Sequence, residues 1–182
     1  MYRMSAVDES ERAEILRLLA ETRDAFLATV EGISEAQARY KPAEDRWSIL
    51  ECAEHVAVSE HGMYRLITKY WEASAEPAGR EGEAIILEKG VDRTLPQVAP
   101  EIARPRGRFA TFAEAVERFR QNRMRTTEFV EQCRDDLRAR TTLHPFAGKI
   151  TCQECLLLLA VHPGRHALQI RELRAAPGFP VV

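Results

Sequence analysis

One helix-start motif, repeated four times, constrains the fold of this 182-residue chain most strongly. In the motif, called a capping box, Ser or Thr precedes Glu or Gln by three residues, and each side chain accepts a hydrogen bond from the backbone amide of the other. The four copies are Ser34–Gln37, Ser48–Glu51, Thr111–Glu114 and Thr151–Glu154. The first copy opens a single turn, whereas apolar residues at helical spacing follow the other three. The motif therefore predicts that long helices begin at residues 48, 111 and 151.

A further amphipathic helix precedes the first capping box. The expected long helices are Ser10 to Gly32, Ser48 to about Ala73, Thr111 to about Leu137, and Thr151 to the Pro177-Gly178 pair. Between the second and third helices, residues 75–110 are rich in Pro and Gly and predict a crossover that passes over one end of the bundle, as a candidate lid. Residues 141–149 are expected to form a loop, and no strands are expected.

These elements predict an all-α protein, a four-helix bundle with a long crossover connection between helices 2 and 3. Short links favour antiparallel neighbours, so we expect the first two helices to pack together and the last two to do the same. The whole chain, residues 1–182, is expected to form a single domain, since this length is that of one ordinary domain.

Charge and hydropathy narrow the classes of partner. The formal net charge is −2 and acids and bases are interspersed, so no basic stripe indicates nucleic-acid binding. The longest strongly apolar run, Leu156 to Val161, is too short to span a membrane. Residues Met1 to Glu14 lack the apolar segment of a signal peptide, and we therefore expect a cytoplasmic protein.

The cysteines favour the same compartment. Four cysteines are few for a disulfide scaffold. Cys152 and Cys155 have the spacing of redox and zinc sites, but the sequence has no second such pair. Cys155 and His162 are seven residues apart, a rise of about 10 Å along a helix, which is too far for both side chains to bind one metal. We interpret Cys52, Cys133, Cys152 and Cys155 as small buried hydrophobes.

Three histidines form the candidate metal site. His162 and His166, four residues apart, lie on one face of the last helix. Two imidazoles rarely hold a catalytic metal, so a third ligand is needed, and the best candidate is His55 on the second helix. His61 falls on the opposite flank of that helix and is not expected to join them.

Pro163 lies between two of these histidines. It removes an amide donor inside a helix, at a cost of about 3 kcal/mol. Either the helix kinks here, or it ends near Val161 and restarts with Pro163 in its first turn. A gain from metal binding would offset this strain, but an ordinary kink in an unliganded helix explains the same residues.

Several motifs together carry a resemblance to a known family. The segments that carry it are Lys41-Pro42, Arg46-Trp47-Ser48-Ile49, Glu54-His55, Glu60, Ala99-Pro100-Glu101, Arg104-Pro105-Arg106-Gly107-Arg108, His144-Pro145-Phe146-Ala147-Gly148 and His162-x-x-Arg165-His166-x-x-Gln169-Ile170. In these segments the chain resembles the DinB/YfiT-like superfamily of bacterial four-helix bundles, from its first helix to its last.

The resemblance implies a metal triad at His55, His162 and His166. It also implies an activity, because members with a known reaction include metal-dependent transferases that use thiols such as bacillithiol or mycothiol, and a mycothiol-dependent isomerase domain. Our first hypothesis is thus a thiol S-transferase-like enzyme acting on small electrophiles. A metal-dependent hydrolase on the same site and a non-catalytic metal-binding or stress-response module are the alternatives.

Three residues are candidates for supporting catalytic roles. Glu51 and Gln169 each lie about one turn from a triad histidine and are candidate partners of its second ring nitrogen, and Glu60 is a candidate proton shuttle. The cofactor is expected to be a divalent metal, zinc or nickel first and iron or manganese next. Arg165 is expected to be solvated or ion-paired, Trp47 to pack at a helix start, and the chain to form a homodimer.

Overall fold

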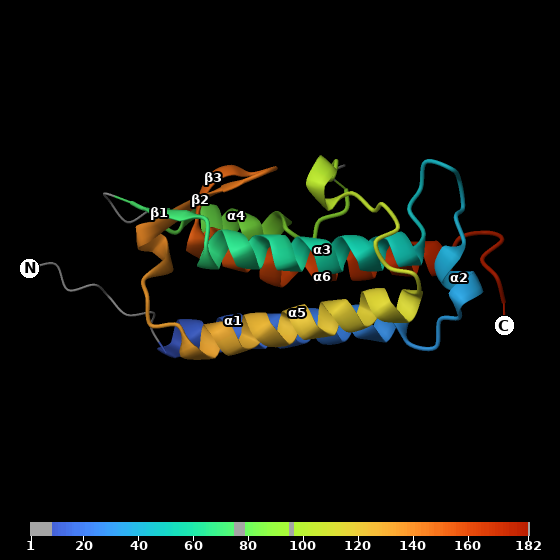
Figure 1. Ribbon diagram of the computed structural model, residues 1–182, viewed down its shortest axis with the longest axis horizontal. Helices are drawn as coiled ribbons and strands as arrows, with labels where there is room; N and C mark the ends of the chain where they lie inside the picture. The colour runs from blue at the N-terminus through green and yellow to red at the C-terminus, as the bar shows by residue number, and fades with distance from the viewer. Residues whose placement is uncertain (1–8, 75–78, 95–96, 182) are drawn as a thin grey trace, which may run out of the picture.

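Four long helices form the bundle in the computed structural model, which describes residues 9–74, 79–94 and 97–181 (Figure 1). They are α1 (Glu9–Val30), α3 (Ile49–Thr68), α5 (Phe112–Gln132) and α6 (Cys152–Arg174). All four capping boxes are present, at the starts of the short helix α2 (Glu35–Arg39) and of α3, α5 and α6. Every long helix predicted from the sequence is confirmed, although α3 and α5 end earlier than the expected Ala73 and Leu137.

The order in which the helices pack differs from the expectation. Helix α1 packs on α5 and α6, and α3 packs on the same two helices. Within the described residues, the successive helices α1 and α3 therefore lie diagonally across the bundle, as do α5 and α6. Helices α3 and α5, which the long connector joins, run side by side in the same direction (Figure 1). The expected antiparallel neighbours were wrong because segments 31–48 and 133–151 are long enough to cross the diagonal.

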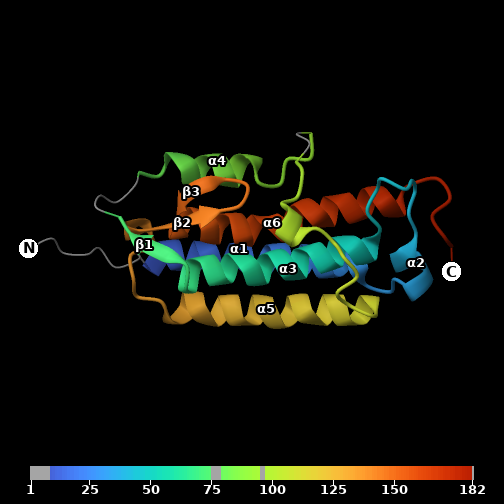
Figure 2. The same cartoon turned by 45° about the horizontal axis from the view of Figure 1, so that its top comes forward.

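The described part of the long connector, residues 79–94 and 97–110, runs along a side of the bundle and not over its end (Figure 2). Its helix α4 (Glu81–Lys89) packs against α6, and the 3-10 turn η1 (Glu101–Ala103) lies on α3 (Figure 2). Arg138 fastens α4, since its guanidinium forms ion pairs with Glu83 of α4 and Glu11 of α1. Residues 75–78 and 95–96 of the connector, and residues 1–8 of the predicted N-terminal segment, lie outside the described part of the chain.

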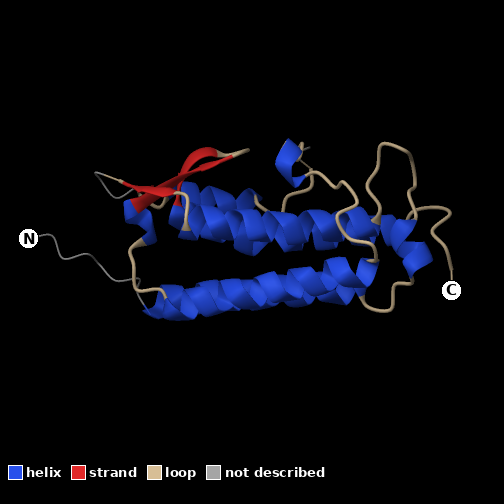
Figure 3. Ribbon diagram, viewed as in Figure 1, coloured by secondary structure: helices blue, strands red, loops and turns tan. Residues whose placement is uncertain are grey.

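A small sheet was not predicted. Strands β1 (Trp71–Ala73), β2 (Arg140–His144) and β3 (Gly148–Thr151) form an antiparallel sheet in the order β1-β2-β3 (Figure 3). β1 occupies the place where the second helix was expected to continue, and β2 and β3 form a hairpin where a loop was expected. The strands are short and rich in β-branched threonine, and Gly148 supplies the positive φ of +72° that the hairpin turn requires.

The bundle core consists of two apolar clusters with a polar layer between them. One cluster includes Phe26 and Phe119, and the other includes Leu19 and Leu156. At the level between them, Arg123 of α5 donates hydrogen bonds of 2.9 and 2.8 Å to the two carboxylate oxygens of Glu60 on α3. Each of these two side chains is 1% exposed, so the pair is held inside the bundle.

Helix α6 runs unbroken through Pro163, so the restart considered from the sequence does not occur. Pro163 has no amide to donate to the Leu159 carbonyl one turn earlier. Arg123 Nη2 donates to that carbonyl at 3.3 Å, and the Thr22 hydroxyl of α1 donates to the neighbouring Ala160 carbonyl at 2.7 Å. Side chains of α5 and α1 thus supply hydrogen bonds at the place where the proline interrupts the helix.

The cysteines largely follow their interpretation as buried residues. Cys52, Cys152 and Cys155 are buried and Cys133 is partly exposed, and all four are free thiols. Within residues 9–74, 79–94 and 97–181, no helix combines the length and the apolar character needed to cross a membrane.

Candidate metal centre

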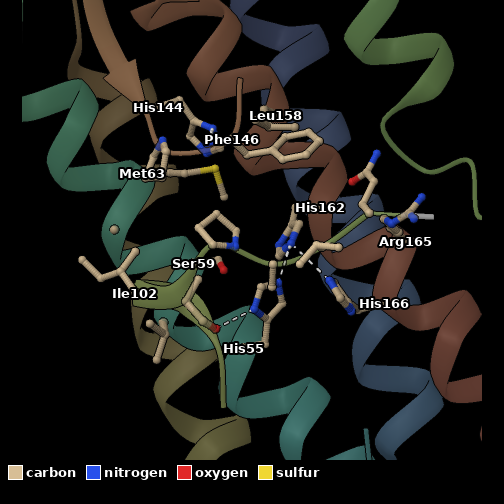
Figure 4. Close-up of a pocket in the computed structure, with 18 of the residues that line it drawn as sticks. His55, Ser59, Met63, Ile102, His144, Phe146, Leu158, His162, Arg165 and His166 are labelled. Atoms are coloured by element: carbon tan, nitrogen blue, oxygen red, sulfur yellow. Dashed lines mark hydrogen bonds between the residues drawn. The ribbon is translucent and has the colours of Figure 1, made fainter. Parts of the chain in front are cut away.

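The imidazoles of His55, His162 and His166 meet between helices α3 and α6 (Figure 4). His162 Nε2 lies 3.1 Å from the Nε2 atoms of both other histidines. His55 and His166 are only 4% and 5% exposed. The structure therefore brings together the three histidines that the sequence singled out, and their binding of a metal stays a prediction.

Hydrogen bonds orient two of the three rings. His55 Nδ1 lies 2.7 Å from the Ala103 carbonyl of η1, and His166 Nδ1 lies 2.9 Å from Gln169 Oε1. Both partners are acceptors, so each ring carries its proton on Nδ1 and leaves a lone pair on Nε2. This is the tautomer that a metal ligand needs.

The arrangement of lone pairs fits a metal ion. A single proton on His162 Nε2 can satisfy only one of the two facing Nε2 lone pairs, whereas one cation among the rings can accept all three. Tetrahedral zinc with Zn–N bonds of about 2.0–2.1 Å places its imidazole nitrogens roughly 3.3 Å apart. The separations of 3.1 Å are close to that spacing.

Burial keeps the rings in their neutral, ligating form. It lowers the pKa of His55 below its usual range, although the hydrogen bond to Ala103 opposes this shift. Burial lowers the pKa values of His162 and His166 further, and charge repulsion from neighbouring histidines adds to the effect. At neutral pH the rings are therefore uncharged, and each has a nitrogen lone pair available to a cation.

A buried carboxylate next to His55 holds the connector against α3. Glu54, which is 2% exposed, accepts hydrogen bonds from the amides of residues 106, 107 and 108 at 2.7, 3.0 and 3.2 Å. The Arg108 guanidinium adds an ion pair at 2.7 Å. Burial alone would raise the pKa of Glu54, but these hydrogen bonds lower it. We call residues 103–108 the strap, because Glu54 binds one end and the Ala103 carbonyl meets His55 at the other.

The triad borders a largely apolar cavity of about 530 Å³. Its walls come from α3, α6, the connector and the β2–β3 hairpin (Figure 4). Apolar side chains on these walls include Trp47, Met63, Leu66, Ile102, Phe146 and Leu158. The cavity gives a small molecule access to the histidines, and its lining favours an apolar one.

Comparison with known proteins places the chain in a family. The sequence model of the DinB superfamily matches residues 18–170. The chain belongs to the DinB superfamily. The DinB/YfiT-like resemblance proposed from the sequence is thereby confirmed. The uncharacterized protein YuaE of Bacillus subtilis strain 168 is 21% identical over 145 residues, which are 80% of this chain and 88% of YuaE.

Solved structures agree with the bundle of this DinB-superfamily chain. YfiT from Bacillus subtilis, described as a probable metal-dependent hydrolase with an unusual four-helix bundle topology, matches with a TM-score of 0.60 and 17% identity. That match covers 99% of this chain and 94% of YfiT. The four-helix bundle protein TT2238 matches with a TM-score of 0.52 and 21% identity, over 88% of this chain and 98% of TT2238. At these identities the similarity shows the fold.

The candidate supporting residues occupy three different environments. Gln169 contacts a triad ring directly, through His166. Glu51 does not reach His55, because its carboxylate closes the capping box with Ser48 and pairs with Lys41. Glu60 lies in the buried ion pair with Arg123, and that pairing leaves it no access to the cavity as a proton shuttle.

Three further expectations receive structural answers. Trp47 packs beside the triad, with its ring centroid 4.9 Å from that of His55. Arg165 is buried, not solvated, and donates to the Asp92 carbonyl, since α6 turns it beneath the connector. His61 is exposed and lies beside Arg125, apart from the triad as expected.

Sequence reasoning missed three contributors to the site: the Ala103 carbonyl, Glu54 and His144. The first is backbone and carries no residue-type signal. Glu54 and His144 occur in the motifs behind the family resemblance, but a role for them requires the strap and the hairpin to be placed in space. Their positions became visible only with the fold.

Proposed function

We propose that this chain is a metal-dependent enzyme that joins the sulfur of a small thiol to an apolar electrophile. One observation carries the proposal: three imidazole Nε2 atoms converge, two of them with tautomers set by hydrogen bonds, at the wall of an apolar cavity. Three histidine ligands with an open position are typical of catalytic zinc sites.

The protein residues would supply ligands, orientation and a largely apolar cavity. His55, His162 and His166 would hold the cation, while Ala103 and Gln169 keep two of the rings in place. A bound divalent cation supplies positive charge that lowers the pKa of a thiol or of water beside it. The thiol sulfur forms a bond to the electrophilic carbon, the leaving group departs with its electron pair, and the thiol proton passes to solvent.

The cavity lining favours a thiol over water as the nucleophile. Activation of water commonly uses a carboxylate as a general base. Among the described residues that line the cavity, Asp45 is the single carboxylate, and it is exposed at the rim. A thiol that has lost its proton to solvent needs no such base.

A metal-dependent hydrolase is the second candidate. The description of YfiT as a probable metal-dependent hydrolase favours it, together with the fold that the two chains share. In that case water would replace the thiol as co-substrate at the same three histidines.

Metal content tests the proposal first. Elemental analysis of protein purified without chelators should find about one equivalent of zinc or nickel. The His162→Ala/His166→Ala variant should hold none, whereas His61→Ala, which changes an exposed histidine away from the triad, should match the wild type. Absence of metal from the wild type, even after reconstitution with zinc, nickel and manganese, would overturn the proposal.

Two assays then separate the candidate reactions. The loaded protein should form a thioether from cysteine and 1-chloro-2,4-dinitrobenzene, with release of chloride, and the double variant should not. Hydrolysis of 4-nitrophenyl acetate without any thiol reaction would favour the hydrolase. Tightly held metal with neither activity would favour the non-catalytic module. The homodimer and the cytoplasmic location remain predictions from the sequence.

A further inference from the structure

A fourth histidine borders the same cavity as the triad. His144 ends strand β2 at the hairpin turn, and Figure 4 shows it with Phe146 across the cavity from His55 and His166. His144 also lies near His162, since repulsion between the charged forms of the two rings is one cause of the lowered pKa of His162. It has no part in holding the metal as described above.

The hairpin turn sets the tautomer of this ring. The amides of Phe146 and Ala147 both donate to His144 Nδ1, at 3.3 and 3.1 Å. A nitrogen that accepts hydrogen bonds carries its lone pair, so the proton of the neutral ring lies on Nε2. Burial lowers the pKa of His144, which agrees with a neutral ring.

The protonated nitrogen is available to a ligand. No residue in the described part of the chain makes a hydrogen bond with His144 Nε2, and this nitrogen is not among the fully buried unpaired polar atoms of those residues. The surrounding wall includes Met63 and Leu158, which offer no strong acceptor. A donor of fixed direction in an apolar cavity is a typical specificity element.

We propose that His144 donates a hydrogen bond from Nε2 to the substrate, and that the cavity selects small molecules with an apolar body and an acceptor oxygen at the hairpin end. This inference rests on the proposed function only in assigning the reacting group to the triad end. The acceptor is a carbonyl, carboxamide or ether oxygen, since a neutral imidazole donor does not call for an anion.

Two substitutions separate ligand recognition from support of the turn. The oxygen of Asn lies near the position of histidine Nδ1, so His144→Asn keeps an acceptor for the two turn amides but removes the distal donor. The amide nitrogen of Gln lies near the position of Nε2, so His144→Gln keeps the distal donor but weakens the turn. If His144 has a purely structural role, His144→Gln should be the variant with impaired ligand binding. The proposal predicts instead that His144→Asn is the impaired variant.

The probes are linear alkanethiols of two to six carbons, each compared with an analogue that ends in a carboxamide. Calorimetry on the zinc-loaded proteins should show that the carboxamide raises affinity relative to the methyl-ended probe in the wild type and in His144→Gln. This preference should fall about fivefold in His144→Asn, the loss expected for one neutral hydrogen bond. Equal preferences in the wild type and His144→Asn, or loss in His144→Gln alone, would overturn the proposal.

A second measurement requires neither metal nor probe. Nitrogen-15 NMR of the imidazoles should show His144 with its proton on Nε2, and a proton on Nδ1 would also overturn the proposal. Failure of the proposed function would give a different result. A wild-type protein that takes up no zinc would refute the metal site, whereas the NMR measurement would still test the role of His144.

Discussion

At the scale of single residues, the candidate site depends on the second nitrogen of each histidine ring. His55 and His166 each donate from Nδ1 to an acceptor, and this directs Nε2 toward the cluster. The two acceptors differ in kind, since Ala103 offers a backbone carbonyl and Gln169 a side-chain oxygen. Only the second can be changed by a simple substitution.

Replacement of Gln169 by Leu should therefore weaken metal binding without removing a ligand. The His166 ring would lose the acceptor that orients it, and the affinity for zinc should fall roughly tenfold, as is common for such partners. Competition with a chromophoric chelator measures the change. Gln169→Glu, which keeps an acceptor at this position, is the matched control. Equal zinc affinities of Gln169→Leu and the wild type would contradict the prediction.

At the scale of elements, the strap couples the connector to the metal centre. Glu54 binds three successive amides of the strap and the guanidinium of Arg108. The same segment presents the Ala103 carbonyl to His55, the residue next to Glu54. The fold thus uses one helix to hold both a ligand and the segment that orients it.

Glu54→Gln should loosen the strap, because its amide group would face amide donors and lose the charge that pairs with Arg108. We expect a loss of about 1.5–3 kcal/mol in the free energy of unfolding, the range for hydrogen bonds to charged groups. Zinc affinity should fall with it. Urea unfolding and chelator competition measure the two effects.

Glu101→Gln is the control for the strap. Glu101 lies in η1, but its ion pairs with Arg104 and Arg106 are exposed. Such surface pairs contribute little, so this change should stay within about 0.5 kcal/mol. A Glu54 variant that behaves like the Glu101 variant would refute the role of the strap.

Helix α6 and Arg123 should show a measurable coupling at Pro163. Arg123→Met leaves the Glu60 carboxylate buried without its charged partner, with the Thr126 hydroxyl still donating to it, and should cost about 3–5 kcal/mol. Pro163→Ala restores an amide donor for the Leu159 carbonyl, which Arg123 otherwise serves. The Arg123 substitution should then cost about 1 kcal/mol less in the Pro163→Ala background. Denaturant unfolding of the four proteins measures this cycle, and strict additivity would contradict it.

At the scale of the whole molecule, what the sequence could predict was local. The capping boxes, such as Ser48 with Glu51, and the spacing of His162 and His166 depend on neighbours within one helix, and both were read correctly. Helix adjacency, the contact of His55 with Ala103 and the placement of the β2–β3 hairpin at the cavity depend on segments far apart in the chain. From link length alone, α1 and α3 were expected to be neighbours, as were α5 and α6, whereas each pair lies across a diagonal of the bundle. The two links can cross the diagonal because they contain helices or strands of their own.

The diagonal packing has a consequence for synthesis on the ribosome. Helices α1 and α3 emerge first, yet each packs against α5 and α6, which begin at Phe112 and Cys152. Because translation adds about 5–20 residues per second, the apolar faces of α1 and α3 stay uncovered for seconds before α5 and α6 are synthesised. A fragment that ends at Ala110 should accordingly show no cooperative thermal transition by circular dichroism, unlike the full chain. Nascent chains of this topology cannot cover the apolar faces of α1 and α3 until α5 has emerged, and they complete the core only with α6.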